Sequence, residues 1–314
     1  MLKNNYIIES TYCLKGDFKI SPFSTDDIRI NKLILEKKVN IEVEKNKFCN
    51  YFKNLLTEDQ EYIITQSGRN AIKSVLETLN LKRNDEVAIL TPTNNFYISG
   101  CVTKEIEKFC GWSREITTKT KVLFVNHEFG VCYEELEKLK KYNLPIIEDC
   151  AHSFASNNSF KTKGLIGDFV IYSFPKYFPI QAGGLLKYKK KYKVNPELDK
   201  NSEDYIKIIV GHYIKNVDKW AKKRINNYLY LEKKMKNLGF KSRFELKEGV
   251  VPGVYMFKNL KNIDLDKLKI YLGNLGIECS VFYGENTFFI PVNHRLEKEE
   301  LDYFVEVIKT FGVL

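Results

Sequence analysis

The chain has 314 residues, 44% hydrophobic and 13% aromatic, a composition that is ordinary for a globular protein and argues against intrinsic disorder. Its formal net charge of +10 comes mainly from lysines and, without a nucleic-acid-binding motif, favours small anionic substrates over nucleic acid as partners. No apolar run approaches the roughly 18 residues of a membrane span, and no signal-peptide core opens the chain. We therefore expect a cytoplasmic protein without a membrane partner.

The cysteines and histidines indicate neither a disulfide framework nor a metal site. Seven cysteines are scattered without a CxxC pair, and the four histidines show no spacing typical of metal ligands. We therefore expect no disulfide framework and no bound metal.

The first 60 residues carry weak signals for regular structure. Residues 6–10 and 18–23 could form short strands, and residues 26–56 show a loosely helical, charged pattern. A polar segment, Thr65–Asn70, then opens an amphipathic helix over residues 71–80. Its Ser-Gly start leaves N–H groups free at the helix end, which suits either a phosphate or an ordinary helix cap.

The middle of the chain alternates strands with helices. Apolar runs bounded by turn residues predict strands at Glu86–Leu90, Ile106–Phe109, Lys121–Val125, Ile146–Ile147 and Phe169–Tyr172. A helical pattern covers residues 134–142. This alternation predicts an α/β fold with a mostly parallel sheet that is covered on both faces.

The composition becomes more charged after Lys190, and we place a domain boundary there, with a large domain of residues 1–195 and a small domain of residues 196–314. The small domain is expected to hold helices at Tyr205–Ile214, Asp218–Leu238, Leu265–Leu275 and Glu297–Phe311. Its expected strands are Val250–Phe257, Gly276–Phe282 and Phe288–Asn293.

Two of the predicted strands end in side chains suited to chemistry. Asp149 follows the strand at Ile146–Ile147, and Lys176 follows the strand at Phe169–Tyr172. Because chemistry in such sheets sits at the carboxyl ends of the strands, the two side chains could meet there. A pyridoxal phosphate site uses such a pair: lysine holds the cofactor as a Schiff base and aspartate pairs with the pyridinium nitrogen. A buried ion pair is the other interpretation, and residue types alone favour it.

The order of short motifs between Pro145 and Leu186 changes that balance. IIEDCAHSF is followed by GD, then by YSFPK and AGGLL, and this order resembles the DegT/DnrJ/EryC1/StrS family of sugar aminotransferases. The resemblance extends from about Ser67 to Leu186 and is weaker at the C-terminus. It implies the pyridoxal-phosphate-dependent transferase fold type I, which is aspartate aminotransferase-like, with a mostly parallel large-domain sheet and a small α/β C-terminal domain.

The resemblance also implies a cofactor, pyridoxal 5'-phosphate, and the residues of its site. Lys176 would hold the cofactor and then act as the base, while Asp149 would pair with the ring nitrogen. Phe96, or Tyr97 as the runner-up, would stack on the ring, and His127 would be structural or peripheral. The implied cofactor-binding residues are Gly68, Arg69, Asn70, Phe96, Asp149, His152, Ser173 and Lys176.

The implied reaction moves an amino group from an amino acid, glutamate in the first instance, to a keto-sugar. The acceptor would be nucleotide-linked and serve surface polysaccharide or glycoconjugate synthesis, and the enzyme would be a homodimer. Two alternatives stay open: an aminotransferase acting on a small phosphorylated ketone or ketose, and a cofactor-binding protein without transfer activity. The first is motivated by the short chain and its altered loop. The second is motivated by the missing Asn-Tyr-Arg segment, with which relatives cross the dimer interface, and by the altered glycine motif at Gln181–Gly184.

Overall fold

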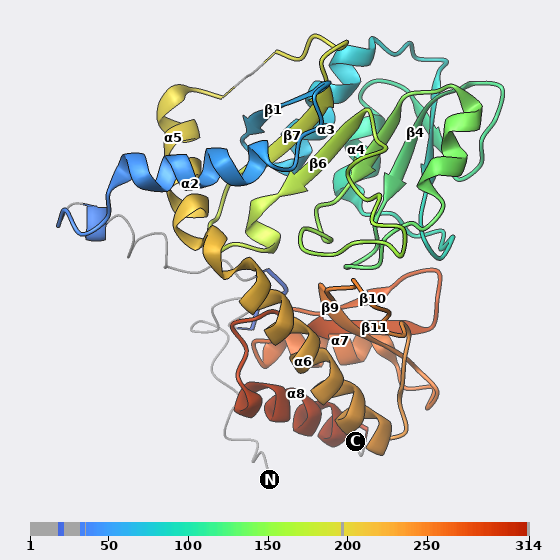
Figure 1. Ribbon diagram of the computed structural model, residues 1–314. Helices are drawn as coiled ribbons and strands as arrows, with labels where there is room; N and C mark the ends of the chain where they lie inside the picture. Colours follow the sequence, from blue (N-terminus) through green and yellow to red (C-terminus); the bar gives the residue numbers. More distant parts are fainter. Residues whose placement is uncertain (1–17, 22–31, 35, 196–197, 313–314) are drawn as a thin grey trace. The chain divides into compact units, whose positions relative to one another are not determined.

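The computed structural model describes residues 18–21, 32–34, 36–195 and 198–312. The chain divides into two compact units: Phe23–Asp218, called the large unit below, and Met1–Pro22 with Lys219–Leu314, called the small unit (Figure 1). Residues 6–10, 22–23 and 26–31, for which strands or helical structure were expected, lie outside the described residues.

The boundary between the units comes later than the predicted position after residue 195. Helix α5 (Lys200–Tyr213) belongs to the large unit because it packs against α2 (Ile41–Lys53) (Figure 1). The ammonium group of Lys45 lies 2.8 Å from the Asp204 carboxylate across this contact. Tertiary packing, and not the change in composition after Lys190, therefore decides where the large unit ends.

The large unit is built on a seven-stranded sheet. Its strands are β1 (Gln60–Thr65), β2 (Glu86–Leu90), β3 (Gly111–Ser113), β4 (Thr120–Asn126), β5 (Ile146–Asp149), β6 (Phe169–Ser173) and β7 (Gly184–Lys189). They lie in the order β1-β7-β6-β5-β4-β2-β3. The pairs from β3 to β6 are parallel, whereas β7 runs antiparallel to both β6 and β1. The prediction of a mostly parallel sheet is confirmed.

Helices cover both faces of this sheet because successive strand residues point to opposite sides. In β2, Val87 and Ile89 join a core that includes side chains of α3 (Gly68–Leu79) and α4 (Gly100–Ile106). Ala88, between them, joins a second core with the 3-10 helix η2 (Leu136–Tyr142). The expected strand at Ile106–Phe109 is wrong: Ile106 ends α4, whose buried Val102 and Ile106 follow the four-residue spacing of a helix, and the edge strand is β3.

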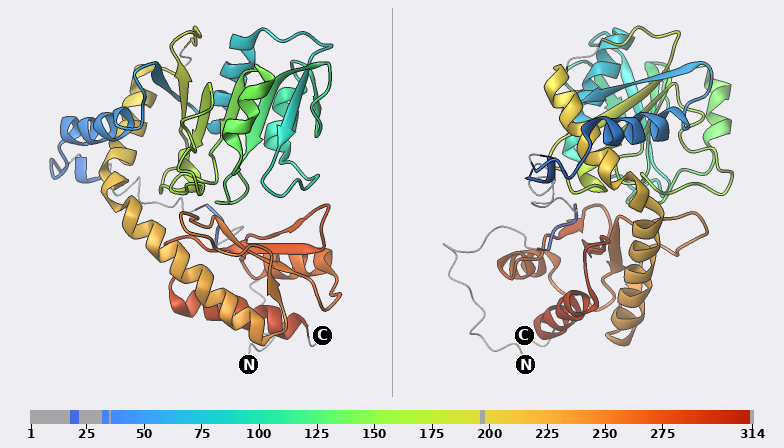
Figure 2. Two further views of the ribbon diagram at one scale, coloured as in Figure 1. Left: turned by 45° about the vertical axis from the view of Figure 1, so that its right-hand side comes forward. Right: turned by 60° about the vertical axis from the view of Figure 1, so that its left-hand side comes forward.

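The small unit holds a four-stranded antiparallel sheet in the order β10-β11-β9-β8. Its strands are β8 (Lys241–Ser242), β9 (Val254–Lys258), β10 (Ser280–Phe282) and β11 (Thr287–Pro291). The helices α6 (Val217–Asn237), α7 (Leu265–Asn274) and α8 (Lys298–Phe311) contribute buried side chains to one core with this sheet (Figure 2). Phe18 joins the same unit through a bridge to Ile277. None of the described helices combines the length and apolar character needed to cross a bilayer.

Candidate active site

Asp149 and Lys176 occupy the carboxyl ends of adjacent parallel strands. Asp149 is the last residue of β5, and Lys176 ends the short 3-10 helix η3 (Phe174–Lys176) that directly follows β6. The Asp149 carboxylate is buried and accepts a hydrogen bond from the Ala151 amide at 2.9 Å. Burial raises the pKa of Asp149 above its usual value, and the positive charge of Lys176 acts in the opposite direction. The sequence had placed these two groups at this sheet edge.

The start of α3 lies beside the end of β6. Ser67 caps the helix by accepting a hydrogen bond from the Asn70 amide at 3.2 Å, and its own hydroxyl donates to Asn70 Oδ1 at 2.7 Å. A Cβ atom on Gly68 would lie 3.2 Å from the Cβ of Ser173. A Cβ on Gly184, the first residue of β7, would lie 2.7 Å from the carbonyl carbon of Ser67. The two glycines therefore allow the helix start, with its free amides, to approach β6 and β7 closely.

Arg69 reaches from the same helix start to α4. Its guanidinium nitrogen Nη2 lies 3.0 Å from the sulfur of Cys101. Burial alone would raise the pKa of the exposed Cys101 thiol, but the hydrogen bond and charge of Arg69, with a further contribution from the Lys176 charge, leave this pKa lowered. Arg69 and Lys176 thus both lower the pKa of this thiol.

The loop after β2 carries Phe96, which was expected to stack on the cofactor. Its side chain is 71% exposed, and its ring centre lies 6.5 Å from that of Trp112. Arg114 holds this loop by donating to the Thr91 hydroxyl at 3.0 Å and to the Asn95 carbonyl at 2.7 Å. A stacking role for Phe96 stays a prediction.

His152 follows Asp149 by three residues, and its ring centre lies 4.8 Å from that of Phe129. Its expected position near the cofactor's phenolic oxygen also stays a prediction.

The residues at this edge fit pyridoxal phosphate. A buried carboxylate and a lysine at the end of the next strand are the pair that the cofactor requires. The glycine-lined start of α3 beside Ser173 offers backbone amides and a hydroxyl, which are the donors that suit a phosphate group. The donor set therefore matches both ends of the cofactor.

Comparison with known proteins agrees with this geometry. Residues 48–187 match the model of a family described as "Putative PLP-dependent aminotransferase". This part of the chain is similar to the pyridoxal-phosphate-dependent aminotransferases that the model describes. GDP-perosamine synthase from Escherichia coli O157:H7 is 30% identical over 149 residues. That alignment covers 41% of this chain and 41% of that enzyme, so the match spans well under half the length of the relative.

Solved structures of aminotransferases share the fold. The aminotransferase TlmJ from Streptoalloteichus hindustanus matches with a TM-score of 0.72 at 13% identity, covering 94% of this chain and 98% of TlmJ. A DegT DnrJ EryC1 StrS aminotransferase from Brucella abortus matches with a TM-score of 0.67 at 14% identity, covering 91% and 95%. The predicted fold type I and the resemblance to these aminotransferases are confirmed, and pyridoxal phosphate is the cofactor in the matched family's description.

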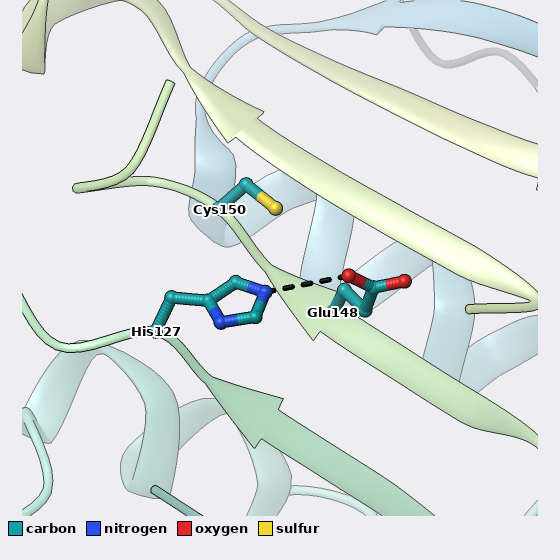
Figure 3. Close-up of side chains that lie close together, drawn as sticks. All are labelled: His127, Glu148 and Cys150. Carbon is teal, nitrogen blue, oxygen red and sulfur yellow. Dashed lines mark hydrogen bonds and ion pairs between the residues drawn. The ribbon is translucent and has the colours of Figure 1, made fainter. Parts of the chain in front are cut away.

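One buried cluster beside Asp149 was not singled out from the sequence. His127, Glu148 and Cys150 bring potential metal-ligand atoms within 4.8 Å of one another (Figure 3). The Nε2 atom of His127 lies 3.3 Å from the Glu148 carboxylate, and both side chains are fully buried. From the sequence, His127 was expected to be structural or peripheral. The signal that could have revealed the pair is a second charged residue, Glu148, between the apolar start of β5 and Asp149.

Proposed function

We propose that this protein is a pyridoxal-phosphate-dependent aminotransferase that moves an amino group from an amino acid to the keto group of a sugar. The observation that carries the proposal is the placement of Asp149 and Lys176 on adjacent strand ends within the part of the chain that matches the family. Glutamate is the proposed donor, and a nucleotide-linked keto-sugar is the proposed acceptor.

The protein's own residues divide the work. Bound pyridoxal phosphate supplies an electron sink for the carbon that loses a proton. Lys176 would hold the cofactor covalently and, once released by the donor, its amine would carry the proton between substrate and cofactor. Asp149 would keep the ring nitrogen protonated through its negative charge. The amides at the start of α3 and the Ser173 hydroxyl would bind the phosphate.

Two observations support a sugar acceptor that carries negative charge. The relative with 30% identity is named for a GDP-linked sugar. The chain itself has a net charge of +10, which favours anionic ligands in general. An acceptor panel that contains a nucleotide-linked keto-sugar and a phosphorylated ketose tests which of the two is the substrate.

The proposal is tested by following the absorbance of the purified protein. Added pyridoxal phosphate should give a visible absorbance band that glutamate then removes, because the cofactor becomes the amine form. Borohydride reduction and peptide mapping should place the cofactor on Lys176, and Lys176→Ala should show neither the band nor transfer. A label on another lysine would reject the assignment of Lys176. A protein that binds the cofactor but does not respond to any amino donor would reject the transfer activity.

A further inference from the structure

Glu148 is a carboxylate in the interior of the large unit, where a histidine ring and two backbone amides surround it. Its side chain is fully buried, and a buried charge is unfavourable unless hydrogen-bond donors compensate for the lost water. His127 Nε2 lies 3.3 Å away, and the amides of Gly164 and Gly167 donate at 2.7 and 2.6 Å. Burial alone would raise the pKa of Glu148, but these donors bring it below its usual value. Glu148 is therefore ionised at neutral pH.

The hydrogen bonds of His127 define how its ring is used. The Tyr133 amide donates to Nδ1 at 3.0 Å, so Nδ1 presents its lone pair. A neutral ring then carries its hydrogen on Nε2, which faces Glu148 (Figure 3). The backbone amide of His127 donates to the carbonyl oxygen of Asp149 at 3.2 Å. His127, which directly follows β4, therefore contacts Glu148 through its ring and Asp149 through its backbone amide.

Two glycines bring the segment between β5 and β6 to the same carboxylate. A Cβ on Gly167 would lie 2.9 Å from Glu148 Oε1 and 2.8 Å from the Phe169 carbonyl oxygen, so a side chain does not fit there. Gly164 has a φ of +75°, and its carbonyl accepts a hydrogen bond from the buried Lys187. This segment joins the two strands that carry Asp149 and Lys176.

We propose that His127 and Glu148 form a positioning pair for Asp149. The pair ties the carboxyl end of β5 to β4 on one side and to the β5–β6 segment on the other. Asp149 consequently keeps the place at which it accepts the Ala151 amide and interacts with the charge of Lys176. The pair acts through Asp149, and its meaning for catalysis rests on the proposed function.

The test compares Glu148→Gln with Asp168→Asn, a control that directly precedes β6 and contacts the opposite end of β5. Asp168 is also a buried carboxylate, and it accepts a hydrogen bond from the Ile146 amide, the first of β5, at 3.0 Å. Both substitutions remove one buried negative charge that anchors β5 or its connection to β6. Only Glu148→Gln does so next to Asp149.

Hydrogen exchange of the cofactor-free protein gives the first readout. In Glu148→Gln the amides of His127 and Ala151, which both donate to Asp149, should exchange roughly tenfold faster than in the wild type, with little change at Ile146. In Asp168→Asn the pattern should be the reverse. Equal acceleration in both variants, or none in Glu148→Gln, would overturn the proposal. If Glu148→Gln does not fold, His127→Phe removes the ring donor instead. The amides of residue 127 and Ala151 should then exchange faster, with little change at Ile146.

The dissociation constant of pyridoxal phosphate gives the second readout. This constant should rise roughly tenfold in Glu148→Gln, because replacing a residue that supports a ligand-binding residue weakens ligand affinity by about that factor or more. It should stay unchanged in Asp168→Asn. An unchanged constant in Glu148→Gln would show that the pair does not serve the cofactor site. A wild-type protein that binds no cofactor would reject the proposed function instead, while the exchange pattern would still decide whether the pair holds Asp149.

Discussion

Asp149 is subject to opposing effects on its ionisation. Burial raises its pKa, whereas the Ala151 amide and the charge of Lys176 lower it. A buried carboxylate can serve as the counter-charge of a protonated ring nitrogen without its charge being screened by solvent. Its chemical value therefore depends on the negative charge and not on its shape.

Asp149→Asn is expected to leave the cofactor bound but to slow proton abstraction from glutamate by roughly 100-fold or more, because an amide supplies no counter-charge. Single-turnover absorbance measurements with glutamate would report this rate. Asp168→Asn, which removes a buried carboxylate beside the first residue of β5, is the control and should react as the wild type does. Near-wild-type turnover of Asp149→Asn would rule out the proposed role of the charge.

His294 is a residue whose burial has a consequence for stability. Its ring stacks on Trp220 with the ring centres 4.0 Å apart and the planes 9° from parallel. Burial lowers its pKa from 6.5 to about 2, with contributions from the charges of Arg224 and Arg295. Between pH 6.5 and about 2, His294 is therefore protonated in the unfolded chain but stays neutral in the folded small unit.

The free energy of unfolding should therefore be highest above pH 6.5 and fall with acidification towards the folded pKa, by up to about 1.4 kcal/mol per pH unit from this residue. Urea titrations at several pH values would measure it. Trp112→Phe leaves Trp220 as the single tryptophan to report on the small unit. Adding His294→Phe should flatten the pH dependence, and an unchanged slope would contradict the assignment to His294.

At the scale of elements, the contact between α2 and α5 depends on one glycine. A Cβ on Gly211 of α5 would lie 2.1 Å from the carbonyl oxygen of Glu44 in α2. The two helix backbones therefore approach more closely than any other residue would permit. The same contact assigns α5 to the large unit.

Gly211→Ala should lower the free energy of unfolding by about 1–3 kcal/mol, because the two helices must move apart to accept the methyl group. Gly273→Ala on α7 is a matched control, since a Cβ there would meet nothing within 4 Å. That control should be neutral or stabilising by up to about 1 kcal/mol, because alanine favours a helix over glycine. Urea denaturation would compare the two, and equal stability of Gly211→Ala and the wild type would show that the helices separate without cost.

At the scale of the whole molecule, we predict a homodimer. Closed two-fold pairs are the commonest soluble oligomers, and the resemblance to sugar aminotransferases implies an active site completed at such an interface. Light scattering on the purified protein should give about twice the chain mass of 36.8 kDa. A monomer that still transfers amino groups would show that the chain completes its cofactor site alone.

Local patterns in the sequence were sufficient for much of the large unit. The apolar runs at Glu86–Leu90 and Lys121–Val125 became β2 and β4, because a short run of buried residues between turn residues has few other places in an α/β fold. The polar residues directly after two such runs placed Asp149 and Lys176 at one sheet edge, since parallel strands end on the same side. The order of the motifs around these two residues was sufficient to indicate the resemblance to the sugar aminotransferases.

Only the tertiary structure decided the features that depend on contacts between distant residues. The pairing of His127 with Glu148, and the approach of Gly167 to the same carboxylate, join segments about 20 positions apart that no local periodicity connects. The bridge from Phe18 to Ile277 spans most of the chain. Ile106 became helical because its side chain packs into the core with Val102, although its neighbours read as a strand. Short-range patterns express backbone preference and burial, whereas the partner of a buried charge is chosen by the packing of the whole unit.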